Sequence, residues 1–335
     1  MVLTLQNNYW SVTQSKDQNI NFELIEADVP EISQGEVLIE NSFSSVNYRD
    51  FLATIGNLGV IRRFPYCPGV DLSGSIIRSK STNFREGDRV AVWAAPANAL
   101  NPGGWSRYII AKEEAVFRLR NNWDFDSTSS IGTAGLAAAL GLASIHHSLN
   151  CKGGDDKKMI ISGASGGVGS LAIILASLFN WTVTAISSSH QKKDFFLNIG
   201  ASDIISLESF TANIKPNLLK SEYDGFIDSV GGDVMVSGLK RLKNGGSAAS
   251  AGLVLSQEIE NLTVLPFIMR GISITGTGSE VASSWRMELA REYLNEIISS
   301  QKLHDITNVI QFDNLDKHVK DWDKQKPMGR SIIAI

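Results

Sequence analysis

Hydrophobic and polar positions alternate over short stretches in the first part of the chain. The clearest alternation covers residues 35–46, and shorter stretches cover 71–78 and 88–93. A period of two is typical of strands with one buried face. Irregular segments rich in proline and glycine, notably 64–69 and 94–104, separate the strands. The pattern predicts a small β-barrel.

Near residue 127 the pattern changes to helices and strands in turn. Residues 129–146 have a helical period, and from residue 159 short apolar strands alternate with helices. The strands expected are 159–162, 181–187, 203–206, 225–229, 247–251 and 271–276, and the helices are 167–179, 190–199 and 234–242. This order predicts a parallel, doubly wound sheet.

The end of the chain breaks this alternation. A helix at 283–298 is followed by a short helix at 315–322 and a strand at 331–335. We therefore expect the last residues to return to the first domain. The barrel domain would then comprise residues 1–123 and 283–335, and the doubly wound domain residues 124–282. The predicted fold class is α/β with two domains.

Composition narrows the class of protein. A chain of 335 residues suggests about two domains, and a net charge of −4 disfavours a nucleic-acid partner. No apolar run approaches the roughly 20 residues that span a bilayer, and we expect no signal peptide, because residues 1–16 are polar. The only cysteines, Cys67 and Cys151, fit a reducing compartment. These features predict a cytoplasmic protein with neither a membrane nor a nucleic-acid partner.

A glycine-rich turn at 163–169 lies between a predicted strand and a predicted helix. Glycines let backbone N–H groups at a helix N-terminus approach a pyrophosphate closely. This context favours dinucleotide binding over a merely tight structural turn. The candidate contacts are Ser165, Gly166, Gly167 and Val168.

The residues after the second strand of this unit indicate which dinucleotide is bound. NAD-binding proteins place an acidic residue there, for the ribose 2′-OH, but no acid occurs in this chain before Asp194. Hydroxyl and ammonium groups suit a 2′-phosphate, so we expect NADP(H). The alternative is that residues 188–190 merely cap a helix. The candidate contacts are Ser187, Ser188, Ser189, Lys192 and Lys193.

Several motifs in sequence order resemble a known family. They include Asn47-Tyr48-Arg49-Asp50, Pro68-Gly69-Val70-Asp71, Gly87-Asp88-Arg89-Val90 and Ile131-Gly132-Thr133-Ala134-Gly135, as well as the turn at 163–169 and the segment 266–271. Together they are similar to zinc-independent medium-chain dehydrogenases/reductases, in the acrylyl-CoA reductase-like quinone oxidoreductase subgroup. The resemblance implies a GroES-like catalytic barrel interrupted by a Rossmann domain. The chain departs from the subgroup at Ala137-Ala138, where a threonine is usual.

The resemblance also bears on metal binding. Zinc-dependent relatives have cysteine where this chain has Asn47, and His-Glu where it has Val70-Asp71. An amide and a valine cannot replace a thiolate and an imidazole as zinc ligands. No cysteine lies between Cys67 and Cys151 to form the four-cysteine lobe of those relatives. We therefore expect no metal, and hydride transfer to an acceptor that is already electron-poor.

Each remaining candidate residue has a functional and a structural interpretation. Asn47 contacts the substrate or the nicotinamide ribose, or caps its own loop. Tyr48 donates a proton to the acceptor, or packs half-buried. Arg62 and Arg63 meet the phosphates of a CoA thioester, or form surface ion pairs. The further cofactor candidates are Thr133, Gly252, Phe267 and Ile268, of which Phe267 and Ile268 would act through their backbone.

These observations predict an NADPH-dependent, zinc-free reductase that transfers hydride to an activated C=C bond, such as that of an enoyl thioester. A quinone or enone oxidoreductase and a non-catalytic NADPH-binding protein are the alternatives. The family resemblance also implies a homodimer, in which the outer strand at 271–276 pairs with its copy. Alternatively, the loop at 279–284 covers that edge in a monomer.

Overall fold

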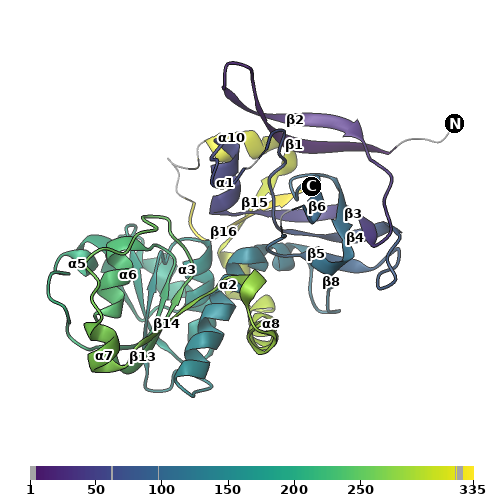
Figure 1. Cartoon of the computed structure of the whole chain (residues 1–335). Coiled ribbons are helices and arrows are strands. Elements are labelled where there is room, and N and C mark those ends of the chain that lie inside the picture. Colours follow the sequence, from purple (N-terminus) through teal and green to yellow (C-terminus); the bar gives the residue numbers. More distant parts are fainter. Residues whose placement is uncertain (1–4, 62, 97, 321, 323–326) are drawn as a thin grey trace. The chain divides into compact units, whose positions relative to one another are not determined.

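The computed structural model describes residues 5–61, 63–96, 98–320, 322 and 327–335. Contacts between residues divide the chain into two compact units. The first unit comprises residues 1–133 and 307–335, and the second comprises residues 134–306. Each unit is built on a sheet of its own (Figure 1).

The first unit contains an eight-stranded sheet and a separate hairpin. The main strand order is β15-β16-β3-β4-β5-β8, with β7 paired to β3 and β6 paired to β7. All of these pairs are antiparallel except β15 with β16. The bounds are β3 Glu36–Val46, β4 Leu72–Ser79, β5 Arg89–Val92, β6 Leu100–Asn101, β7 Tyr108–Lys112, β8 Phe117–Arg118, β15 Thr307–Gln311 and β16 Arg330–Ala334; the hairpin is β1 Gln6–Gln14 with β2 Ile20–Asp28. The three strands expected from alternation are confirmed as β3, β4 and β5.

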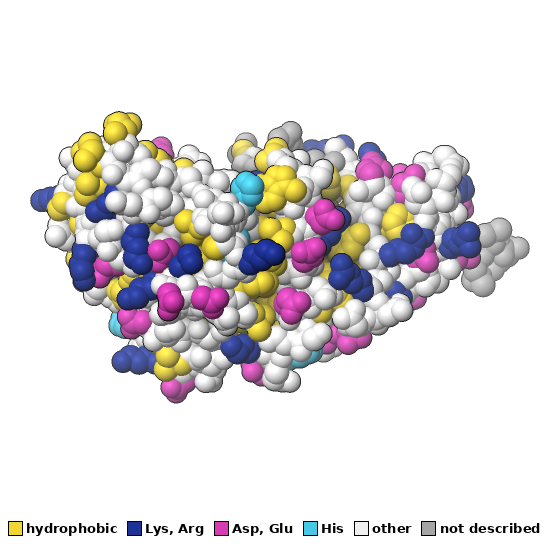
Figure 2. Space-filling model, turned by 90° about the horizontal axis from the view of Figure 1, so that it is seen from below, with side chains coloured by type: hydrophobic (Ala, Val, Ile, Leu, Met, Phe, Trp, Pro, Cys, Tyr) yellow, Lys and Arg dark blue, Asp and Glu magenta, His cyan; other side chains and the backbone are white. Residues whose placement is uncertain are grey.

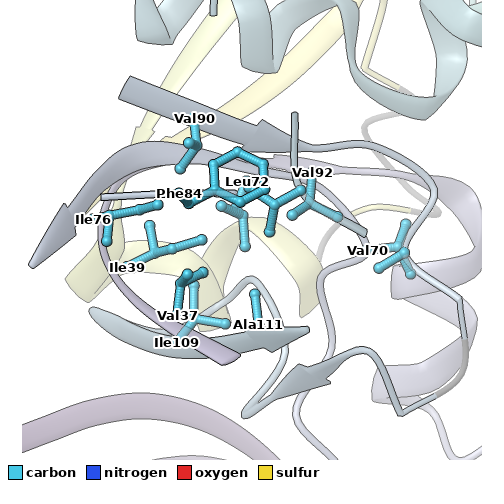
Figure 3. Close-up of a cluster of buried hydrophobic side chains, with 12 residues drawn as sticks. Val37, Ile39, Val70, Leu72, Ile76, Phe84, Val90, Val92, Ile109 and Ala111 are labelled. Carbon is cyan, nitrogen blue, oxygen red and sulfur yellow. The ribbon is translucent and has the colours of Figure 1, made fainter. Parts of the chain in front are cut away.

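Strand β3 lies inside this sheet, and it is buried more fully than the one buried face that alternation predicted. Ile39 is opposite Ile76 of β4 and opposite Ile109 of β7. These side chains belong to one buried cluster with Val37, two positions earlier on the same face (Figure 3). Leu38 points to the other face and joins a second cluster. Both faces of β3 are therefore buried at this point.

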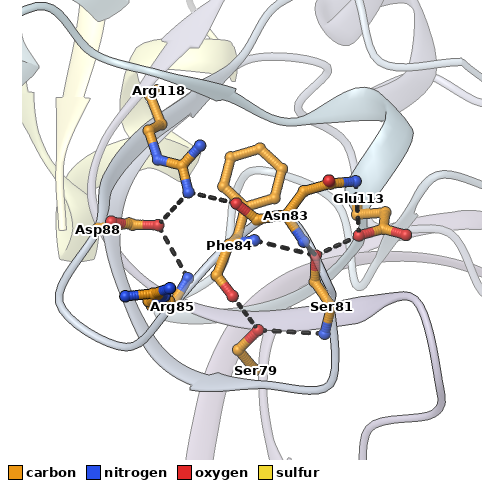
Figure 4. A network of polar contacts seen from close by, with 8 residues as sticks. All are labelled: Ser79, Ser81, Asn83, Phe84, Arg85, Asp88, Glu113 and Arg118. Atoms are coloured by element: carbon orange, nitrogen blue, oxygen red, sulfur yellow. Dashed lines mark hydrogen bonds and ion pairs between the residues drawn. The ribbon is translucent and has the colours of Figure 1, made fainter.

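A polar network closes the connection between β4 and β5 (Figure 4). The carboxylate of Asp88 accepts hydrogen bonds from the Arg85 backbone N–H at 2.8 Å and from Arg118 Nη2 at 2.9 Å. Ser81 Oγ donates to the carboxylate of Glu113. The backbone hydrogen bond from Arg85 is the main reason that the pKa of Asp88 is lowered. These bonds hold the connection by its side chains as well as by its backbone.

The second unit contains a six-stranded parallel sheet in the order β11-β10-β9-β12-β13-β14. Helices lie on both sides of this sheet (Figure 1). The strands are β9 Lys158–Ser162, β10 Thr182–Ser187, β11 Asp203–Ser206, β12 Tyr223–Asp228, β13 Leu242–Ser250 and β14 Ser273–Gly276. The helices between them are α3 Gly167–Leu178, α4 Lys193–Ile199, α5 Leu207–Thr211, α6 Gly232–Leu239 and α7 Leu265–Arg270. The predicted doubly wound parallel sheet is confirmed.

The structure groups residues 283–306 with this second unit, whereas the sequence placed them with the barrel domain. It groups residues 124–133 with the first unit, whereas the sequence placed them with the doubly wound domain. Helix α8, Ser284–Ile298, contacts α3, and the short α9, Gln301–Asp305, follows it. The reason is packing: Tyr293 is buried, and its hydroxyl lies 2.6 Å from His146 Nδ1. His146 in turn accepts a hydrogen bond at Nε2 from Trp181. The amphipathic helix was correctly expected, but its buried face serves the parallel-sheet unit.

Helix α2, Phe125–Ser148, is interrupted at Gly132, where φ is 49° and ψ is −157°. Among the described residues, it is the one helix long and apolar enough to cross a bilayer by length and composition. Its most apolar window is 89% buried inside the fold, which is typical of a core helix. Two short helices complete the first unit, α1 Tyr48–Thr54 and α10 Leu315–Lys320.

The surface carries charges of both signs. On the face drawn in Figure 2, Lys and Arg side chains alternate with Asp and Glu side chains, and neither sign covers a large area. That face therefore offers no continuous basic area of the kind that binds nucleic acid.

Candidate functional site

The glycine-rich turn of the second unit connects β9 to α3. Gly163 has φ +57°, and a Cβ on it would lie 2.2 Å from Ser229 Oγ. A Cβ on Gly169 would lie 2.3 Å from the carbonyl oxygen of Gly163. Only glycine fits at these two positions, so the twelve-residue helix begins directly against the strand. The first N–H groups of α3 have no partner within the helix and can bind an anion.

Hydrogen bonds and close packing connect the carboxyl ends of three neighbouring strands, β9, β12 and β13, beside this turn. Asp228, at the end of β12, is buried and accepts hydrogen bonds from Ser162 Oγ at 2.5 Å and from Gly231 N–H at 2.8 Å. Burial raises the pKa of Asp228. A Cβ on Gly252, after β13, would lie 2.4 Å from the carbonyl oxygen of Ser229. The structure thus places Gly252 at the edge where ligands of such sheets bind.

The residues after β10 divide into bonded and exposed side chains. Ser187 is buried, and its hydroxyl accepts a hydrogen bond from the Ser189 N–H at 3.0 Å. Ser188, Lys192 and Lys193 are exposed. Helix α4 begins at Lys193, and the residue at its N-cap is Lys192, whose side chain makes no capping bond. The alternative that residues 188–190 cap this helix is therefore wrong, and the exposed side chains are available to a phosphate.

Phe267 and Ile268 lie in α7. The backbone N–H groups of both donate to the carbonyl oxygen of Val264, at 3.1 and 3.0 Å. The Ile268 side chain is 71% exposed, and Phe267 packs against the buried cluster of the sheet. The helix uses their N–H groups, and the backbone contacts to a cofactor that the resemblance implied for these residues stay a prediction.

In the first unit, one buried carboxylate brings together residues that the sequence singled out separately. Asp71 Oδ2 accepts hydrogen bonds from Ser45 Oγ at 2.5 Å, Asn47 Nδ2 at 2.9 Å and the Thr133 N–H at 2.9 Å. Asp71 Oδ1 accepts from Thr133 Oγ1 at 2.5 Å and from the Ala94 N–H at 3.0 Å. Asn47 and Thr133 therefore lie side by side, held by the same side chain.

A second buried carboxylate, Asp50, lies on the other side of Asn47. Asp50 Oδ2 accepts from the Asn47 N–H at 3.0 Å and from Asn47 Nδ2 at 3.1 Å, and Oδ1 accepts from the Gly69 N–H at 3.1 Å. Burial, followed by the negative charge of Asp71, raises the pKa of Asp50 to about 6. Tyr48, the first residue of α1, is 38% exposed, so its side chain reaches solvent.

The cation of this cluster comes from the far end of the chain. Arg330 is buried; its Nε donates to the carbonyl oxygen of Ser130 at 2.6 Å, and its Nη1 contacts Asn47 Oδ1 at 3.4 Å. Its Nη2 has no hydrogen-bond partner among the described residues. Burial lowers the pKa of Arg330, while Asp71 and Asp50 raise it. The sequence analysis missed both Arg330 and the role of Asp71; the one available signal was that Asp71 replaces a residue next to a zinc ligand in other family members.

Of the two arginines expected at the substrate, Arg62 lies outside the described residues. Arg63 is exposed, and its Nη2 lies 3.4 Å from Asn98 Oδ1. Within the described ranges, no three His, Cys, Asp or Glu side chains gather in a way that could hold a metal ion. The absence of metal nevertheless stays a prediction.

Two protein-domain families match the chain. The alcohol dehydrogenase GroES-like domain matches residues 33–121, and the zinc-binding dehydrogenase family matches residues 167–295. The first match lies within the first unit and the second within the parallel-sheet unit.

The curated proteins that are similar to the chain include acrylyl-CoA reductases and quinone oxidoreductases. A protein of Escherichia coli named "Probable acrylyl-CoA reductase AcuI" is 30% identical over 252 residues, which are 75% of this chain and 76% of that protein. The acrylyl-CoA reductase AcuI of Ruegeria pomeroyi is 26% identical over 302 residues, 90% of each chain. A quinone oxidoreductase of Sus scrofa is 26% identical over 228 residues, 67% of this chain and 66% of that protein.

Solved structures agree with these matches over nearly the whole chain. The YhdH oxidoreductase from Salmonella enterica, solved in complex with NADP, has a TM-score of 0.89 and 25% identity, covering 99% of this chain and 100% of that one. The YhfP protein of Bacillus subtilis, solved with NAD bound, has the same TM-score, identity and coverage.

Proposed function

Because the chain belongs to the medium-chain dehydrogenase/reductase family, in the group of the acrylyl-CoA reductases and quinone oxidoreductases, we propose that it is an NADPH-dependent oxidoreductase. Its substrate class is an activated C=C bond, such as that of an acrylyl-CoA-like enoyl thioester. The observation that carries the proposal is the glycine turn at the start of α3, followed after β10 by exposed hydroxyl and ammonium groups with no acid before Asp194.

The second unit fits a dinucleotide. Side chains at Gly163 and Gly169 would fill the space that lets the backbone approach a pyrophosphate. Residues 165–168 would bind that pyrophosphate, and Ser188, Lys192 and Lys193 would bind the 2′-phosphate. Bound NADPH supplies a hydride from its nicotinamide ring. The residues of the turn contribute orientation, because a rigid helix start fixes the phosphates.

The first unit supplies the residues that act on the acceptor. Tyr48 has an exposed side chain, and either its hydroxyl or a water molecule donates the proton that the acceptor takes up after it has gained the hydride. Asn47 and Thr133 are both hydrogen-bonded to Asp71, and they orient the reactants. Arg63, an exposed cation, binds a phosphate of the CoA group.

We propose that the reaction proceeds without zinc, although one matching family is described as zinc-binding. Asn47 stands where zinc-dependent relatives have cysteine, and its amide nitrogen contacts two carboxylates. An acceptor conjugated to a carbonyl group needs no Lewis acid to accept a hydride at its β-carbon. We also propose the reducing cytosol as the compartment, on the strength of the two unpaired cysteines.

A quinone is the second candidate acceptor, since a similar protein of Sus scrofa is named a quinone oxidoreductase. The test is NADPH oxidation with acrylyl-CoA, crotonyl-CoA and 1,4-benzoquinone measured side by side. We expect the highest kcat/KM with acrylyl-CoA. Turnover of benzoquinone alone would replace the enoyl thioester by the quinone. NADPH binding without turnover of any acceptor would instead indicate a non-catalytic binding protein.

A further inference from the structure

The side-chain amide of Asn47 lies between opposite charges. Its Nδ2 contacts one oxygen of Asp50 at 3.1 Å and one of Asp71 at 2.9 Å, while its Oδ1 contacts Arg330 Nη1 at 3.4 Å. Rotating the amide by half a turn would place its oxygen against two carboxylates and its NH₂ against the guanidinium. Each contact would then be repulsive. The buried charges therefore select one orientation of this amide.

Thr133 is held by the same carboxylate through two bonds. The helix break at Gly132 leaves the Thr133 N–H outside the regular helical ladder, and Asp71 Oδ2 accepts from it at 2.9 Å. The Thr133 hydroxyl donates to Asp71 Oδ1 and accepts from the Ala94 N–H at 2.9 Å. Its proton is therefore directed at Asp71, and its side-chain torsion is fixed from two sides.

Gly132 makes room for this arrangement. A Cβ on Gly132 would lie 2.6 Å from Asp71 Oδ2 and 3.1 Å from Arg330 Nη2. The carboxylate and the guanidinium therefore both reach the helix break, and any larger residue at position 132 would push them away. The positive φ of 49° favours glycine at this position as well.

Burying this charged cluster costs free energy of folding. The fold buries Asp50, Asp71 and Arg330 almost completely, and Arg330 Nη2 has no acceptor among the described residues. Buried charges cost free energy that well-packed apolar side chains would not cost. Departures of this kind from a stable core concentrate at functional sites. The residues fixed by the cluster, Asn47 and Thr133, are the ones that the proposed function uses.

We propose that Asp71 and Arg330 are positioning residues, which hold the Asn47 amide in one orientation and Thr133 in place, and that hydride transfer depends on this arrangement. The inference rests on the proposed reductase function. Neither residue needs to contact the reactants. Asp71 acts through Asn47 and Thr133, and Arg330 acts through Asn47 Oδ1.

The test uses the full-length Asp71→Asn variant, which keeps the shape of the side chain and removes its charge. We expect kcat with acrylyl-CoA to fall at least about tenfold while KM for NADPH stays within about twofold, because misplaced groups slow the chemical step. The primary kinetic isotope effect with NADPH deuterated at the transferred position should rise. Asp88→Asn, the same change at a carboxylate of the polar network in Figure 4, is the matched control and should retain wild-type kcat.

A second pair of variants covers the case in which Asp71→Asn does not fold. Arg330→Lys keeps the cation and should retain more activity than Arg330→Met, although both lose the guanidinium. Equal activity of the two at equal folded fraction would overturn the proposal. So would an Asp71→Asn protein whose kcat is within twofold of wild type.

A measurement without catalysis separates this inference from the proposed function. The Asn47 side-chain NH₂, assigned by ¹⁵N NMR with an Asn47→Asp variant, should exchange slowly with solvent in the wild type and faster in Asp71→Asn. Unchanged exchange would contradict the positioning role. If the wild type oxidises NADPH with none of the acceptors, the proposed function fails, and the exchange rates still decide whether Asp71 holds Asn47.

Discussion

A Cβ atom on Gly169 would lie 2.3 Å from the carbonyl oxygen of Gly163, which is closer than real Cβ contacts come. The first turn of α3 therefore packs directly against the end of β9. We expect Gly169→Ala to push the two apart and to weaken NADPH binding at least about tenfold, since the phosphates need this close approach. Fluorescence titration measures it. Gly276→Ala is the control, because a Cβ there meets nothing within 4 Å; equal weakening in both variants would contradict the argument.

The exposed residues after β10 predict the cofactor preference. NADPH should bind at least about tenfold more tightly than NADH, because a single phosphate contact is worth on the order of 1.4 kcal/mol. The double variant Lys192→Gln/Lys193→Gln should reduce that ratio. Lys220→Gln, at an exposed lysine paired with Glu222, should leave it unchanged. Equal affinities of the wild type for NADPH and NADH would contradict the prediction.

Metal content is predicted from Asn47 and Val70, which stand where zinc-dependent relatives have cysteine and histidine. Purified protein should contain well under one zinc per chain by elemental analysis. NADPH oxidation should survive incubation with a strong chelator. Stoichiometric zinc whose removal abolishes turnover would overturn the zinc-free mechanism.

The carboxyl group of Asp50 predicts how stability depends on pH. Its pKa is raised from 3.8 to about 6, so the folded state binds this proton more tightly than the unfolded state does. The free energy of unfolding should therefore fall as pH rises from 4 to 6, by about 3 kcal/mol in total, and the loss should be complete above that range. The ionisable groups that interact with Asp50 are Asp71, Tyr66, Cys67 and Arg330.

The measurement compares urea unfolding of the wild type with that of Asp50→Asn, which has no carboxyl group to titrate at this position. The difference between their free energies of unfolding should change by about that amount between pH 4 and pH 7. Parallel stability curves would show that Asp50 does not titrate in this range.

Strand β14 predicts the assembly. It lies at an edge of the parallel sheet, and Ile274 is 39% exposed there. Because an exposed apolar edge tends to pair, we expect a homodimer in which two copies of β14 meet across a two-fold axis. Ile274→Lys should then give a monomer by light scattering. Val309→Lys, on the edge strand β15 of the other sheet, should remain dimeric. A wild-type protein that is monomeric at micromolar concentration would contradict the prediction.

The sequence predicted the fold wherever local pattern and tertiary packing agree. Strand β11 has the predicted bounds, and α3 differs from its prediction by one residue at its end. The hairpin of β1 and β2 was missed, because the side chains of β2 are half-buried or exposed and give only a weak alternation. Helix α7 was missed because it is only six residues long. A helix this short is stabilised by its contacts with β13 rather than by its own pattern.

The sequence predicted less of the candidate site in the first unit. Asn47 and Thr133 were found through their motifs, but nothing local marks Asp71 as the side chain that joins them. Its donors come from residues 45, 47, 94 and 133, and the cation that interacts with it is Arg330. Such a cluster depends on long-range pairing, here of β3 with β4 and β16. The glycine turn was found because all of its determinants are close together in the sequence.

The place of β16 in the first sheet has a consequence for how the protein is made. Strand β3 pairs with β16, Arg330–Ala334, so that sheet can close only after residue 334 has been synthesised. The second unit, residues 134–306, is complete earlier. At about 5–20 residues per second, the first 133 residues wait roughly 10–40 seconds for their last strands. During this interval Asp50 and Asp71 have no Arg330 beside them, so the two carboxylates stay without their cation until the last strand is made.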